Sequence, residues 1–136
     1  MKRHPALIAL SRDHHTALVW AKRAQRSREA DSTVLMAQLI TVFENELEPH
    51  FRTEGRDILP VLERQGHHAL VAQTLEEHRI LRAEVDKMRT GCAGSLISFG
   101  AALVAHVRFE ERIVFPAVES ALSRQIDLLK SGLTTG

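Results

Sequence analysis

Two segments of this chain repeat one pattern, and the repeat restricts the fold more than any other feature. Residues 50–60 read HFRTEGRDILP, and residues 106–116 read HVRFEERIVFP. Comparing 50–63 with 106–119, six of fourteen positions are identical: His, Arg, Glu, Arg, Pro and Glu. Residues four apart lie about 40° apart on an α-helix, one turn along, so each His and Glu can point into the same small volume. The repeat therefore predicts two related helices that present equivalent side chains.

The rest of the chain also has helical periodicity, and no segment alternates convincingly as a β-strand. Apolar stripes predict four helices, over about 6–28, 33–63, 68–89 and 95–129. Long helices joined by short loops predict an all-α fold, an up-down-up-down four-helix bundle. We expect a single domain over 1–136, with a core over about 4–122 and a flexible tail at 131–136.

The apolar stripes also predict which residues form the core. The inward residues are Leu7, Leu10, Ala17, Ala21 and Ala24; Leu35, Leu39, Val42, Phe43 and Leu47; Val71, Leu75, Leu81, Val85 and Met88; Phe99, Leu103, Val114 and Ala117. Pro49, Pro60 and Pro116 interrupt these helices or lie near their ends. Each proline removes an amide donor, so we expect it to kink or tighten the local turn.

Composition excludes several classes of function. A formal net charge of +1 gives no electrostatic case for binding nucleic acid or a membrane surface, and the apolar runs are too short to span a bilayer. The N-terminus does not have the pattern of a signal peptide, and a single cysteine, Cys92, fits a reducing cytoplasm. Histidine is unusually frequent, with eight residues.

Each predicted helix places one histidine on its apolar stripe, and two of the helices add a glutamate four residues later. These six residues are His14, His50, Glu54, His78, His106 and Glu110. Burying two unpaired carboxylates would cost several kcal/mol each, and coordinating a cation would remove most of that cost. Nitrogen and oxygen ligands from four helices suit a pair of first-row metals.

Two alternatives bear on this interpretation. A single HxxxE on a helix is usually a surface pair, but the segment DHHTAL at 13–18 also echoes EHRILR at 77–82, which favours a pseudo-twofold bundle around a metal centre. On the first helix, His14 and His15 lie about 100° apart, so only one of them can face the centre. His14 continues the apolar stripe and is preferred.

This arrangement of residues resembles the hemerythrin-like (HHE cation-binding) domain family over about residues 4–122. The resemblance rests on one His in the first and third helices and on HxxxE in the second and fourth, the latter before Phe-Pro. It implies a four-helix bundle with a non-haem di-iron site bridged by an oxo, hydroxo or water ligand. His14, His50, His78 and His106 would be terminal ligands, and Glu54 and Glu110 would be bridging carboxylates.

The chain departs from the oxygen-carrying hemerythrins on the third helix. Those proteins have two histidines four apart on the third helix, whereas Thr74 and Arg82 flank His78 here. The resulting more open metal pair would be less suited to reversible O2 binding and better suited to reacting with small molecules or sensing them. Hemerythrins proper also use a carboxylate at the position of Glu111, but symmetry with the second helix favours Glu110. Glu46 is the nearest candidate for a vacant carboxylate position.

The resemblance therefore implies a di-iron protein that binds, senses or reacts with O2, NO or peroxide, with Zn or Mn as possible substitutes for iron. A protein partner is possible, and the oligomeric state is left open. The alternatives are a di-iron redox enzyme, an iron-centre repair protein, or a bundle held together by a structural divalent metal. A binding or sensing role is favoured over that of a dedicated enzyme.

Overall fold

The computed structural model describes residues 4–130, and these residues form four long helical rods. The first rod is α1 (Pro5–Gln25), which is followed by the short 3-10 helix η1 (Glu29–Asp31). The second rod joins α2 (Ser32–Val42), η2 (Phe43–Leu47), α3 (Glu48–Thr53), η3 (Glu54–Ile58) and α4 (Leu59–Arg64). The third rod is α5 (His68–Arg89), and the fourth joins α6 (Gly94–Phe109), η4 (Glu110–Val114) and α7 (Phe115–Lys130). The tail at 131–136 lies outside the described residues.

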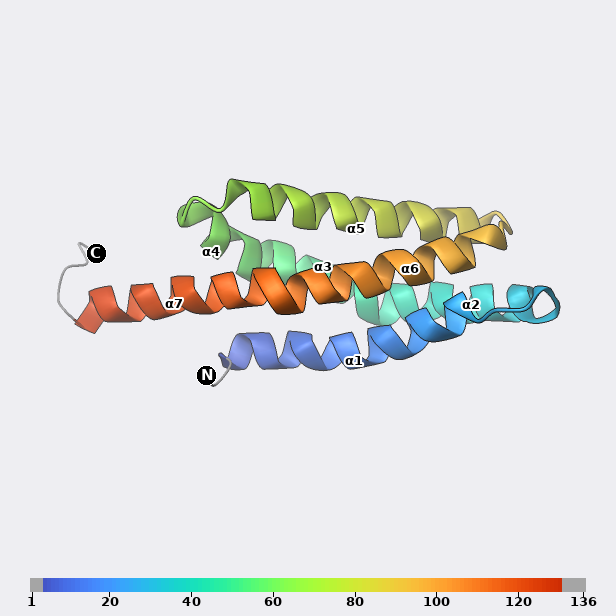
Figure 1. Ribbon diagram of the computed structural model, residues 1–136, viewed down its shortest axis with the longest axis horizontal. Helices are drawn as coiled ribbons and strands as arrows, with labels where there is room; N and C mark the ends of the chain where they lie inside the picture. Colours follow the sequence, from blue (N-terminus) through green and yellow to red (C-terminus); the bar gives the residue numbers. More distant parts are fainter. Residues whose placement is uncertain (1–3, 131–136) are drawn as a thin grey trace.

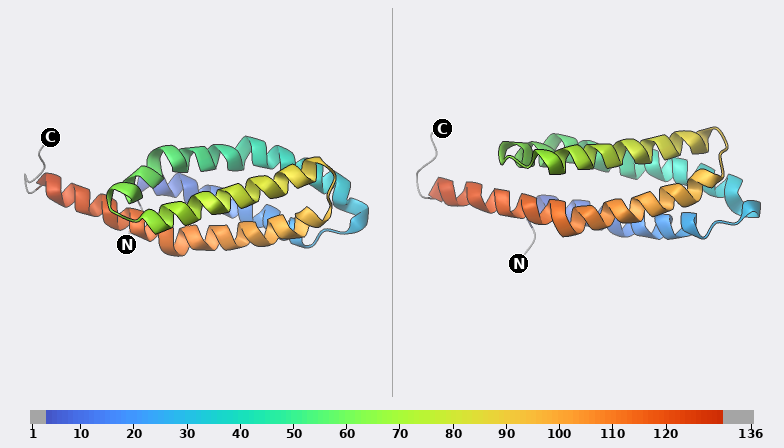
Figure 2. Two further views of the ribbon diagram at one scale, coloured as in Figure 1. Left: turned by 90° about the horizontal axis from the view of Figure 1, so that it is seen from above. Right: turned by 45° about the horizontal axis from the view of Figure 1, so that its top comes forward.

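The rods run alternately in opposite directions, as the loop lengths predict (Figure 1). α1 packs against α6, and α5 packs against both α6 and the second rod. Figure 2 shows the same arrangement from two further sides, with α7 extending beyond the ends of the other helices. The predicted all-α, up-down-up-down bundle is confirmed. Among residues 4–130, no helix is long and apolar enough to cross a lipid bilayer.

The sequence predicted that each of the three interior prolines kinks or tightens its turn, but the turn before each proline is widened and not tightened. η2, η3 and η4 are π-helical turns, and each ends two residues before a proline: Pro49, Pro60 or Pro116. A proline has no N–H for the usual bond and its ring clashes with the carbonyl four residues earlier, so a wider turn relieves both problems. Two of these turns begin at Glu54 and Glu110. The prolines thus shape the backbone directly after both predicted glutamate ligands.

The hydrophobic core consists of two apolar clusters with a polar layer between them. One cluster, built around Leu39, Phe43, Phe99 and Leu103, fills the end of the bundle near the α1–α2 connection. The other includes Leu7, Leu10, Ile58, Phe115 and Val118. In every rod, the predicted ligand residues lie at the boundary between the residues of one cluster and those that belong to the other or pack against it. The apolar packing on both sides therefore keeps the side chains of this layer buried.

The predicted core is confirmed except at a few positions. Leu75 is 49% exposed, while Thr74 beside it is fully buried. On α5, the inward face runs through Thr74, His78, Leu81 and Val85, which leaves Leu75 well to one side of it. Val42, Val71 and Ala117 are only partly buried.

Gly100 lies at a close contact between α1 and α6. A Cβ at this position would lie 2.7 Å from the carbonyl oxygen of Ala21 and 2.7 Å from Cγ of Gln25. Only glycine allows two helices to pack at this separation. The contact holds α1, which carries His14, against α6, which carries His106.

Candidate metal centre

The polar layer contains all six residues that the sequence singled out, and all six are buried. Glu54 and Glu110 are 0% exposed, and the histidines are between 1% and 5% exposed: His78, His106, His50 and His14. They come from four different rods and converge between the two apolar clusters. His15, by contrast, is exposed on the outer face of α1.

The four imidazoles direct their Nε2 atoms at the two carboxylates. Nε2 of His14 lies 2.9 Å from Oε1 of Glu110, and Nε2 of His106 lies 3.2 Å from the same oxygen. Nε2 of His78 lies 3.1 Å from Oε1 of Glu54. Nε2 of His50 lies between the two, 3.3 Å from Glu54 Oε1 and 3.6 Å from Glu110 Oε1.

These side chains form two overlapping clusters with the spacing of metal-binding groups. We call Glu54, His78, His106 and Glu110 the four-residue cluster, and His14, His50 and Glu110 the three-residue cluster. In each cluster, one ligand atom per residue lies within 4.8 Å of every other. Glu110 belongs to both clusters, so a carboxylate at this position can be shared by two neighbouring cations.

The second oxygen of each glutamate supports a cation as the missing partner. Glu54 Oε2 and Glu110 Oε2 are buried and have no hydrogen-bond partner within residues 4–130. A buried carboxylate oxygen without a partner costs free energy, so each one requires an explanation. A donor set of imidazole nitrogens and carboxylate oxygens, buried and already converging, fits a divalent first-row metal.

The electrostatics of the layer favour an ionised Glu54. Burial alone would raise the pKa of Glu54, but hydrogen bonds and charge interactions with His50 and His78 outweigh it and lower this pKa to about 2. Burial likewise opposes protonation of His50, yet Glu54 and Asp13 raise the pKa of His50 above its usual value. The layer therefore holds negative charge that a cation can neutralise.

Two of the imidazoles are held in the neutral form. Burial lowers the pKa of His14, and the charge of His50 lowers it further. Burial is also the main cause of the lowered pKa of His78. A neutral imidazole keeps a lone pair on one ring nitrogen, which is the form that binds a metal.

Aromatic rings fix the planes of these same two imidazoles. His14 stacks on Phe115 with 5.2 Å between ring centroids, and His78 stacks on Phe51 at 3.9 Å. The Arg82 guanidinium lies over the Phe51 ring, 5.6 Å from its centroid, and donates to both oxygens of Glu48. The side chain four residues after His78 therefore points away from the centre.

Carboxylates contact the outer nitrogens of His50, His106 and His14, and the sequence gave two of these carboxylates, Asp13 and Glu77, no role. His50 Nδ1 donates to Asp13 Oδ2 at 3.0 Å, and His106 Nδ1 donates to Glu77 Oε1 at 2.7 Å. Asp13 and Glu77 immediately precede His14 and His78. The shared acid-His pair in DHHTAL and EHRILR was the signal that could have revealed them.

The structure also places the residues about which the sequence left alternatives. Glu111, the alternative to Glu110, is outside both clusters; it accepts a hydrogen bond from Ser11 and lies 3.3 Å from His14 Nδ1. Thr74 is buried, and its hydroxyl donates to the Leu70 carbonyl at 2.8 Å. Glu46 is exposed and lies outside both clusters. The preference for Glu110 over Glu111 as a metal ligand stays a prediction, and so does Glu46 as a candidate for a vacant carboxylate position.

Comparison with known proteins agrees with the fold and the centre. The family model of the hemerythrin HHE cation binding domain matches residues 6–118, so the chain belongs to this family. Comparisons with curated proteins and with solved structures gave no significant match. The chain is thus a member of a cation-binding family, and its own interior contains His/Glu clusters that could hold a metal.

Proposed function

We propose that this protein binds two iron ions in the polar layer and uses them to bind, sense or react with a small molecule such as O2, NO or peroxide. The observation that supports this most is the sharing of Glu110 between the four-residue and three-residue clusters. Two adjacent ligand sets with a common carboxylate fit a pair of metals better than they fit one. His14, His50, Glu54, His78, His106 and Glu110 would hold the pair.

The supply of ligands supports reaction or sensing over simple oxygen carriage. The two clusters offer four imidazoles and two carboxylates, and Thr74 occupies the place of a further histidine with its hydroxyl engaged by the backbone. When bound, the iron pair would supply redox chemistry and open coordination positions for the small molecule. The protein provides apolar packing on both sides of the centre, which limits the access of solvent to it.

The test is to load the metal-free protein with Fe²⁺ without air and then add O2, NO or hydrogen peroxide separately while recording absorption spectra. We expect at least one of them to change the spectrum, and we expect no stable, reversible oxygenation. Repeated turnover of peroxide would favour the redox enzyme. A zinc-loaded protein that is fully stable, together with an iron form that responds to none of the three, would favour a structural metal and contradict the proposal.

A further inference from the structure

The acid-His pairs of α1 and α5 each contact two other rods. In α1, His14 turns inward to Glu110 while the preceding Asp13 reaches across to His50 in the second rod. In α5, His78 turns inward to Glu54 while the preceding Glu77 reaches across to His106 in the fourth rod. The same arrangement therefore occurs twice, related by the pseudo-twofold symmetry of the bundle.

We propose that Asp13 and Glu77 are positioning residues, each of which sets the metal affinity of a different half of the centre. This inference rests on the proposed function. A carboxylate that accepts from Nδ1 fixes the imidazole in the tautomer whose Nε2 lone pair faces inward, and it makes that nitrogen a stronger ligand. Asp13 acts on His50, a member of the three-residue cluster, and Glu77 acts on His106, a member of the four-residue cluster.

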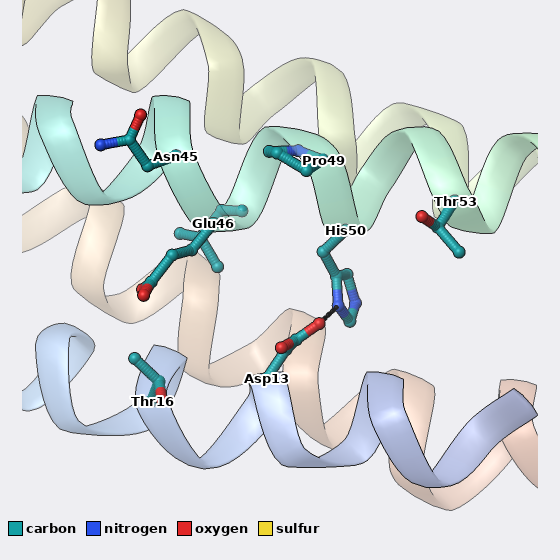
Figure 3. A pocket seen from close by; sticks show the side chains of 8 residues that line it. Asp13, Thr16, Asn45, Glu46, Pro49, His50 and Thr53 are labelled. Atoms are coloured by element: carbon teal, nitrogen blue, oxygen red, sulfur yellow. Dashed lines mark hydrogen bonds and ion pairs between the residues drawn. The ribbon is translucent and has the colours of Figure 1, made fainter. Parts of the chain in front are cut away.

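The surroundings of the two carboxylates differ. Glu77 is the more enclosed, with 23% of its side chain exposed, and its second oxygen accepts a hydrogen bond from Gln73. Asp13 is 47% exposed and lies in the wall of a polar cavity of about 290 Å³, together with Thr16, Asn45 and Glu46. Figure 3 shows the Asp13 carboxylate turned toward the His50 ring at this cavity. Water can replace part of the contact at Asp13, so we expect the larger effect at Glu77.

The main experiment measures Fe²⁺ affinity without air, by competition with a chromogenic chelator, for Asp13→Ala and Glu77→Ala. Each variant should weaken binding at one of the two positions by about 10- to 100-fold and leave the other position close to wild type. Asp13→Asn and Glu77→Gln keep an acceptor oxygen and should recover part of the loss. The matched controls are Asp86→Ala and Glu76→Ala, which remove exposed acids paired only with arginines of α5 among the described residues.

A spectroscopic signature separates positioning from a general loss of packing. In the zinc-loaded protein with ¹⁵N-labelled histidine, the Nδ1–H protons of His50 and His106 should be protected from exchange with solvent. Asp13→Ala should remove this protection at His50 alone, and Glu77→Ala should remove it at His106 alone. A merely structural role would lower the stability of the bundle without selecting one imidazole.

The outcomes distinguish this inference from the proposed function. Two tightly bound ions in the wild type, with both alanine variants binding as tightly as the controls, would overturn the inference alone. Equal weakening at both positions by either variant would also overturn it. A wild-type chain that binds neither Fe²⁺ nor Zn²⁺ would overturn the proposed function, and the inference with it.

Discussion

Replacing Gly100 with alanine tests whether the close packing of α1 on α6 is as tight as the structure shows. The added Cβ would lie 2.7 Å from Ala21 O and 2.7 Å from Gln25 Cγ, whereas ordinary contacts begin at 3.4 Å. Gln25 Cγ belongs to a flexible side chain that can move, but Ala21 O is a backbone atom. Relief at that atom requires α1 and α6 to separate by several tenths of an ångström.

Two opposing terms set the size of the effect. Alanine in place of glycine inside a helix gains up to about 1 kcal/mol of helix propensity. Overpacking a tight contact costs about 1–3 kcal/mol. Because Ala21 O is a backbone atom, as is Gln25 N at 3.2 Å, we expect the cost to win, with a net loss of about 1–2 kcal/mol. For a domain of this size, that corresponds to a fall in Tm of roughly 4–8 °C.

The assay is urea denaturation of the metal-free proteins, with Gly55→Ala as the matched control. A Cβ at Gly55 meets nothing within 4 Å, so this variant should be unchanged or up to about 1 kcal/mol more stable. Adding Gln25→Ala to Gly100→Ala should restore only part of the loss, since the Ala21 carbonyl remains. If Gly100→Ala is as stable as the wild type, the helices are not packed as closely as described.

Three further predictions concern the centre and the core. Glu110→Ala should abolish binding of both metal ions, whereas Glu54→Ala should leave about one ion in the three-residue cluster. Metal analysis of the two variants measures this, and equal loss of metal in both would contradict the sharing of Glu110. In metal-free protein, Glu54→Gln should lower the free energy of unfolding by up to about 3 kcal/mol. This difference should shrink as pH falls from 4.5 toward 2, because a carboxyl whose pKa is lowered by folding stabilises the fold only while it is ionised. A difference in unfolding free energy that stays constant down to pH 3 would refute this. Phe99→Ala should cost about 3–5 kcal/mol in urea denaturation, since the ring is fully buried away from the centre; a loss below 1 kcal/mol would show that this part of the core is loosely packed.

The helices and the inward residues of the centre followed from sequence because both depend on one-dimensional periodicity. Apolar spacing located the four rods to within a few residues, and the positions of His14, His50, His78 and His106 on those stripes brought them to one level. The prediction that Leu75 is buried was wrong because it rested on the apolar character of the side chain. The less apolar Thr74 occupies the inward position.

Other features depend on relations between helices, which periodicity does not contain. The contacts of Asp13 with His50 and of Glu77 with His106 cross from one rod to the next, so they require the packing of the bundle. The widened turns before Pro60 and Pro116 follow from a steric clash whose outcome, a kink or a π turn, is decided by the surrounding core. The hydrogen bond that Glu111 accepts from Ser11 likewise depends on where α1 places Ser11.

The central claim is that the polar layer holds a pair of metal ions. The most direct test is the metal content per chain, by mass spectrometry, of protein purified without added metal. The account predicts about two iron ions per chain. No metal above trace levels in a chain that is fully helical would contradict it, because the buried histidines and glutamates would then satisfy one another without a cation.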